Sequence, residues 1–245
     1  MTSTERFPLR RACDGGAETG ECAVVLLRVE GAQFHLGLRR SSRSGEPVIH
    51  LAWHRRLRDE PLTRLLRNDD ALFPSAVIAL GLDSDLDLAL QALSLRVRDR
   101  HAGRHSGLAY GFDDRFPPFD ASTGAPTDPE GAFTCATFVL ALLRSVGVDL
   151  VDPDRWRPPT EEDLEWQRSI GDRLIAFVER AIHGEIYDAS DTADGMRSRV
   201  ERALGSRRYR PPDVAGAATL GASKWPAAAQ EADPRAEELV ALLSA

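Results

Sequence analysis

Cys135 is the residue of this chain best suited by type and position to act as a nucleophile. The apolar residues after it recur at helical spacing to about residue 146, and Thr134 is a suitable N-cap, so the sequence predicts a buried helix that begins at Cys135. A helix N-terminus lowers the pKa of a thiol, and its unpaired N–H groups can hold a developing oxyanion. We therefore interpret Cys135 as a nucleophile and Thr134 as the cap and a member of the oxyanion site. A buried structural cysteine is the alternative.

A thiol nucleophile needs a base, and imidazole is suited to this role because its pKa lies near neutrality. His35 and His50 stand in two neighbouring predicted strands. If the hairpin folds about residues 42–43, His35 faces His50 and Gly37 faces Val48. Opposed side chains of a sheet lie about 5 Å apart, so one imidazole can orient the other.

His54 is an alternative catalytic histidine, because a hairpin loop shifted by a few residues pairs His35 with His54 instead. It also precedes a basic stretch and suits the surface of the protein. Six arginines lie on the hairpin or just after it, where they form a solvated face or read an acidic group of a substrate. These residues are Arg39, Arg40, Arg43, Arg55, Arg56 and Arg58.

His101 and His105 are four residues apart, which on a helix would place both on one face. Gly103 and Gly107 indicate a loop instead, and no carboxylate motif of a zinc enzyme accompanies the pair. We therefore predict neither a metal site nor a cofactor.

The elements that position these residues can be read from the hydrophobic pattern. Residues 22–30, 33–39 and 47–54 predict three strands of an antiparallel meander, residues 76–82 a short buried strand, and residues 83–98 a helix. Glycines and prolines make residues 101–130 a long loop, in which Tyr110 and Phe112 are candidates for substrate contact.

Four helices are predicted after residue 153, near residues 160–183, 193–204, 211–219 and 233–244. The first of them opens with a capping box at Thr160. The chain is thus expected to have an α+β fold, in which an antiparallel sheet packs on the helix that bears the nucleophile. We divide it into a flexible arm at residues 1–20, a catalytic core at 21–152 and a helical extension at 153–245 that packs on the core.

Three segments together resemble a known family. They are Phe34-His35-Leu36-Gly37-Leu38, Val48-Ile49-His50-Leu51-Ala52 and Thr134-Cys135-Ala136-Thr137-Phe138-Val139. In this order they resemble the circularly permuted papain-like proteins of the NlpC type, and more narrowly the branch that contains lecithin retinol acyltransferase. The resemblance implies that Cys135 is the nucleophile and that one of His35 and His50 is the base, which the other orients.

The acyltransferases of that family have Asn-Cys-Glu-His before Phe-Val, where this chain has Thr134 before Cys135 and Ala136-Thr137 after it. This difference favours a peptide or amide substrate over a lipid ester. The function expected is that of a cysteine peptidase or amidase that forms a thioester intermediate. An acyltransferase or lipid esterase of the same fold is one alternative, and a catalytically silent protein-binding module is the other.

The charge balance limits the partners. A net charge of -7 argues against nucleic acid or an anionic membrane, since both attract an excess of positive charge. The longest apolar stretch is too short to span a bilayer, and the first residues lack the apolar run of a secretory signal. We therefore expect a cytoplasmic enzyme whose partner is a peptide or acyl-bearing substrate.

Overall fold

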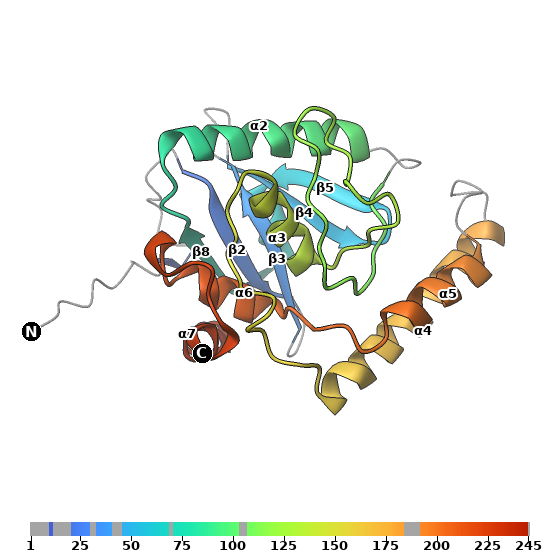
Figure 1. The fold of residues 1–245 in the computed structure, drawn as a ribbon. Helices are drawn as coiled ribbons and strands as arrows, with labels where there is room; N and C mark the ends of the chain where they lie inside the picture. Colours follow the sequence, from blue (N-terminus) through green and yellow to red (C-terminus); the bar gives the residue numbers. More distant parts are fainter. Residues whose placement is uncertain are drawn as a thin grey trace, which may run out of the picture.

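A computed structural model describes residues 10–11, 21–29, 33–40, 46–68, 71–102, 107–183 and 192–244. The fold is α+β, as the sequence predicts, and is built on a six-stranded antiparallel sheet with the order β1-β8-β2-β3-β4-β5 (Figure 1). The strands are β1 (Arg10–Arg11), β2 (Ala23–Arg28), β3 (Phe34–Arg39), β4 (Pro47–Trp53), β5 (Arg56–Pro61) and β8 (Ser75–Ala79). Of the predicted arm at residues 1–20, the structure describes Arg10–Arg11, which pairs with β8.

The sheet has two differently covered faces because side chains alternate along each strand. Leu36 and Leu38 of β3 pack in the main hydrophobic cluster with α3 (Cys135–Ser145), α2 (Ser84–His101) and α6 (Pro211–Ala218). Val25 and Val48 point to the other face and pack against the short helix α1 (Leu62–Leu65). His35 alternates along β3 with Leu36 and Leu38, and His50 follows Val48 by two residues along β4. Both histidine side chains therefore leave their strands on the α1 side of the sheet.

The register predicted for the β3–β4 hairpin is wrong by two residues. Leu38 pairs with Ile49 and Arg39 with Val48. The same register places Gly37 opposite His50, whereas the predicted register places it opposite Val48. A shift of two keeps every side chain on its face, so His35 and His50 still meet, as diagonal neighbours. Gly37 makes this approach easy, since a Cβ built there would lie 3.2 Å from Cβ of His50.

β5 was not predicted, because its sequence alternates one leucine with charged residues. Leu57 faces the core, and the arginines around it belong to the cluster for which the sequence predicts either a solvated face or contact with an acidic group of a substrate. Arg39 and Arg40 of that cluster are in fact buried and paired, Arg39 with Glu46 and Arg40 with Asp59. They stabilise the hairpin and are not open to a substrate. Arg43 lies outside the described residues.

The helix predicted after Thr134 is confirmed as α3, and its start is well defined. The Thr134 hydroxyl accepts from the Thr137 amide at 3.1 Å, and the Thr137 hydroxyl accepts from the Thr134 amide at 2.8 Å. This reciprocal capping box fixes the first turn, in which Cys135 is the first helical residue. Gly147 ends the helix with a φ of 83°, a conformation that favours glycine.

The chain after residue 153 is helical, as predicted. It forms α4 (Glu161–His183), α5 (Ala193–Ala203), α6, the 3₁₀ turn η1 (Ala222–Lys224) and α7 (Ala229–Ser244). Thr160 and Asp163 make the expected capping box at the start of α4. In Figure 1, α4 and α5 lie side by side away from the sheet, whereas α6 packs directly on β2 and β3. A small second sheet joins β6 (Arg67–Asn68) to β7 (Ala71–Leu72).

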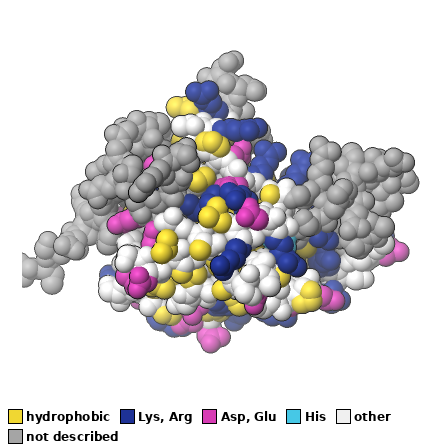
Figure 2. All heavy atoms as spheres, turned by 90° about the horizontal axis from the view of Figure 1, so that it is seen from above, with side chains coloured by type: hydrophobic (Ala, Val, Ile, Leu, Met, Phe, Trp, Pro, Cys, Tyr) yellow, Lys and Arg dark blue, Asp and Glu magenta, His cyan; other side chains and the backbone are white. Residues whose placement is uncertain are grey.

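The described surface is mixed in character. In the view from above, basic and acidic side chains lie interspersed with single hydrophobic ones (Figure 2). The exposed large hydrophobic residues of the described ranges are Leu72 of β7, Leu88 and Leu95 of α2, and Leu204 just after α5. None of the helices in the described ranges combines the length and hydrophobicity that a bilayer crossing requires.

Candidate active site

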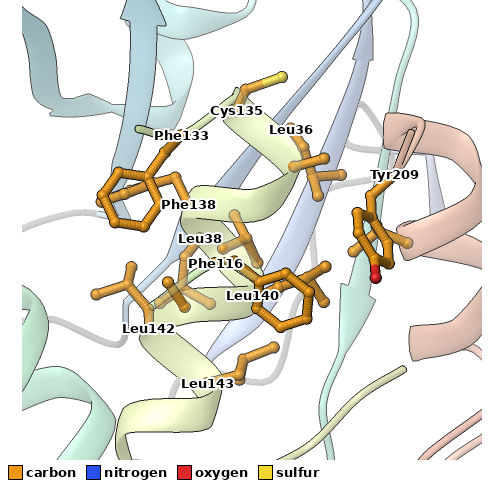
Figure 3. Close-up of a cluster of buried hydrophobic side chains, with 14 of the residues drawn as sticks. Leu36, Leu38, Phe116, Phe133, Cys135, Phe138, Leu140, Leu142, Leu143 and Tyr209 are labelled. Carbon is orange, nitrogen blue, oxygen red and sulfur yellow. The ribbon is translucent and has the colours of Figure 1, made fainter. Parts of the chain in front are cut away.

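Cys135 stands at the edge of the main hydrophobic cluster, and its sulfur points away from that cluster (Figure 3). The side chain is buried, with 7% of the residue exposed. Burial raises the pKa of the thiol to about 11, although hydrogen bonds from the amides of Leu36, Ala136 and Cys135 itself lower it. The expectation of a lowered thiol pKa is therefore wrong, because desolvation outweighs the helix N-terminus.

The amide of Leu36 connects the thiol to the strand of the histidines. This N–H belongs to the peptide bond between His35 and Leu36, so the sulfur lies within hydrogen-bonding reach of the backbone of His35. Within the described residues, β3 and β4 pair at two positions, Leu38↔Ile49 and Arg39↔Val48. The two strands thus lose their pairing toward the end of β3 that carries His35.

The two imidazoles form a part-buried chain with a carboxylate. Nε2 of His35 lies 2.8 Å from Nδ1 of His50, and Nε2 of His50 lies 3.0 Å from Oε1 of Glu60. The ring centroids are 4.9 Å apart in an edge-to-face arrangement. Since β5 pairs with β4 along its length, the Glu60 carboxylate is held beside His50 by the sheet itself.

This chain fixes the tautomers of both rings. The carboxylate of Glu60 accepts, so Nε2 of His50 carries the proton and Nδ1 of His50 must accept from Nε2 of His35. Nδ1 of His35 is then left without a proton. A basic nitrogen is therefore available on the ring whose backbone touches the thiol.

Burial keeps both rings neutral. It lowers the pKa of His35 to about 3, with the neighbouring His50 adding to the effect and Glu60 opposing it. It lowers the pKa of His50 to about 4, together with the charge of Arg58 and against that of Asp59. At neutral pH the site thus holds a protonated thiol beside neutral imidazoles, not a thiolate–imidazolium pair.

The thiol and the imidazole chain open into one large cavity of about 1440 Å³. Its lining includes Cys135, His35, His50 and Glu60, together with the aromatic residues Trp53 and Tyr110. Among the described residues, Sγ of Cys135 forms no hydrogen bond with the ring of His35 or His50. The structure thus brings the thiol and the imidazoles to one cavity but not into contact, because His35 and His50 leave their strands on the α1 side of the sheet whereas α3 packs on the other side.

The other predicted site residues have different surroundings. Tyr110 lines both the large cavity and a separate cavity of about 410 Å³, whereas Phe112 lines the smaller one but not the large one. His54 is buried rather than at the surface, and its Nδ1 accepts from the amide of Tyr110 at 3.1 Å. The hydroxyl of Thr134 and the amide of Thr137 are engaged in the capping box, so the amides of Cys135 and Ala136 are the ones in the first turn of α3 that remain near the thiol.

Sequence reasoning missed Glu60, Arg208 and Trp166. Glu60 was hidden in the charged stretch of β5, where only the alternation around Leu57 indicates a strand. Arg208 and Trp166 come from the helical extension, which the sequence does not connect to the cavity.

Metal binding is not supported at the histidine pair of residues 101 and 105. The ring of His101 lies 3.0 Å from the carbonyl of Gly124, and His105 falls outside the described residues. In the part of the chain that the structure describes, no group of three or more His, Cys, Asp or Glu side chains could hold a metal ion.

The comparisons with known proteins add no further evidence. No protein-family model, curated protein or solved structure matches this chain. The assignment of a function therefore depends on the geometry of the site.

Proposed function

We propose that this chain is a cysteine-dependent hydrolase that cleaves an amide or peptide bond through a thioester on Cys135, with a papain-like arrangement of helix and sheet. One observation carries the proposal. Cys135 lines the same cavity as His35, His50 and Glu60, which form a hydrogen-bonded chain there.

The neutral resting state determines how the thiol would react. Sγ of Cys135 attacks the substrate carbonyl carbon while its proton passes through a bridging water in the shared cavity to Nδ1 of His35. The carbonyl electrons become an oxyanion, which the N–H groups of the first turn of α3 stabilise. The C–N bond then breaks and the leaving amine takes the proton from His35. Water attacks the thioester with His35 again as base, which frees the acid and restores the thiol.

His50 and Glu60 act by positioning in this scheme. Each time His35 becomes an imidazolium, its Nε2–H donates to His50, whose own Nε2–H donates to Glu60. The carboxylate lies at the far end of the chain and stabilises the positive charge without taking part in bond making.

Trapping of the thioester tests the proposal. Incubation with a series of N-acyl anilides should add the acyl mass to Cys135, and hydroxylamine should remove it. Cys135→Ala should abolish the adduct and the release of aniline. Cys22→Ala is the matched control, because Cys22 is a second buried thiol that packs in the same hydrophobic cluster but outside the cavity. Equal activity of the two variants would refute the proposal.

A binding module without turnover is a second candidate. The specific observation in its favour is that the thiol is protonated and forms no hydrogen bond with His35 or His50 in the described structure. Ligands that bind in the cavity without forming an adduct on Cys135 at any pH would support it.

A further inference from the structure

Arg208 extends from the helical region into the cavity of the thiol. It lies in the segment between α5 and α6, and its carbonyl accepts from Nε1 of Trp156 at 3.3 Å. Its guanidinium lies over the ring of Trp166, with Cζ 4.0 Å from the ring centroid. The side chain is 17% exposed and lines the same cavity as Cys135. Arg208 is thus fixed in place in the cavity that the proposed nucleophile also lines.

Most of the hydrogen-bonding capacity of Arg208 is unused. Its Nη1 donates to Oδ1 of Asp163 at 3.2 Å, and among the described residues this is its one side-chain hydrogen bond. A guanidinium has five N–H donors. The remaining donors belong to a side chain that lines the cavity, where a planar anion can accept two of them side by side.

The charge around Arg208 is not fully balanced. Asp163 is shared, since it also accepts from Arg210 at 2.9 Å and from the Thr160 amide at 3.0 Å. Burial would raise the pKa of Asp163, but the hydrogen bonds of Thr160 and Arg210 outweigh burial and lower it to about 2. One carboxylate therefore faces two guanidinium groups. Glu162, 3.8 Å from Arg210, is 75% exposed, so solvent screens its contribution.

Arg208 is also close enough to act on the reacting groups. Burial is the main influence on the pKa of both Cys135 and Tyr110, and the charge of Arg208 lowers both values against it. The ring centroids of Tyr110 and Trp53 lie 4.9 Å apart with the rings tilted by 35°, so the two side chains give this part of the cavity an aromatic wall. A ligand held here meets an apolar surface and a positive charge next to the thiol.

We infer that Arg208 binds a carboxylate of the substrate, so that the amides presented to Cys135 come from acidic peptides or from free chain ends. The inference rests on the proposed function and names the substrate class of the same site. Either carboxylate, from an acidic side chain or from a chain terminus, fits the guanidinium fork. The two sources are separated by the experiment.

The test is calorimetric binding to the Cys135→Ala variant, which needs no turnover. Two matched ligand pairs are used: N-acetylphenylalanine against its amide, and N-acetylglutamate amide against N-acetylglutamine amide. The carboxylate of at least one pair should bind about 10- to 100-fold more tightly than its neutral twin, as expected for a charged hydrogen bond. The pair that discriminates identifies the source. Equal affinity within both pairs would overturn the inference, and no mutation of Arg208 is needed for that result.

Arg208→Gln in the same background should abolish the preference, and Arg208→Lys should retain part of it. Arg144→Gln is the control, because Arg144 also lies over an aromatic ring, 4.1 Å from the centroid of Phe116, but outside the cavity. A preference that persists in Arg208→Gln would place the carboxylate elsewhere. A preference for carboxylates without a thioester on Cys135 would support the binding site at Arg208 and refute the proposed hydrolase activity. Turnover that does not depend on the charge of the substrate would support the hydrolase activity and refute the carboxylate site.

Discussion

Acidification should destabilise the fold through the buried His50 and the half-buried His35. A ring whose pKa is lower in the folded than in the unfolded state stabilises the fold above the unfolded pKa and loses that contribution as pH falls. For His35 this loss occurs between pH 6.5, the pKa of the unfolded state, and a folded-state pKa of about 3. For His50 it occurs between pH 6.5 and a folded-state pKa of about 4. Between about pH 7.5 and about pH 5, linkage assigns each ring about 2 kcal/mol of lost unfolding free energy.

Urea unfolding at these two pH values measures the effect. His35→Gln keeps a donor toward His50 and should reduce the pH-dependent loss by about 2 kcal/mol, and the double variant with His50→Gln by about 4 kcal/mol. Cys135→Ala, in the same cavity, should retain the full loss. If the wild type and the double variant lose equal stability on acidification, the rings are not held neutral and the reasoning on the tautomers fails.

Three further outcomes are expected. The rate of alkylation of Cys135 by iodoacetamide should rise with an apparent pKa of about 11. The free energy of unfolding should fall as pH rises from 9.0 toward that value. An alkylation midpoint near the pKa of a free thiol would contradict the burial argument. Gly37→Val should cost about 1–3 kcal/mol in urea unfolding, since even a Cβ there would lie 2.6 Å from Cγ1 of Val48. Glu60→Gln can present an N–H to His50, which reverses both tautomers and should reduce turnover about 10²- to 10⁴-fold in an anilide assay; an unchanged rate would remove Glu60 from the site.

The parts of the fold that the sequence predicts are those coded by local pattern. The sequences of β2, β3 and β4 either alternate between apolar and polar residues or are continuously apolar, and turn residues bound them. The cap at Thr134 is likewise a local motif. The three strands and the cap all appear in the structure. β5 escapes prediction because Leu57 is its one apolar anchor between charged neighbours. The register of the hairpin also escapes, because it depends on the conformation of the loop rather than on its composition.

The candidate site shows the same division between local and global information. The position of Cys135 at a helix start is local information. That His35 and His50 share one face of the sheet follows from the strand period of two. The sign of its pKa shift depends on how deeply the whole fold buries the thiol, which no local motif records. Arg208 is more distant still, because it reaches the cavity from a segment that follows Cys135 by two further helices.

A carboxylate bound at Arg208 would strengthen the neutral character of the resting site. The guanidinium now opposes the effect of burial on the Cys135 thiol, and an anion on it would cancel that opposition. The substrate complex would then hold the thiol proton more firmly than the free protein does. In the proposed mechanism, proton transfer to His35 would then accompany the attack, and the Glu60 end of the chain would stabilise the imidazolium formed at that moment. We expect such a thiol to react slowly with electrophiles in neutral solution and faster with a carbonyl positioned in the cavity.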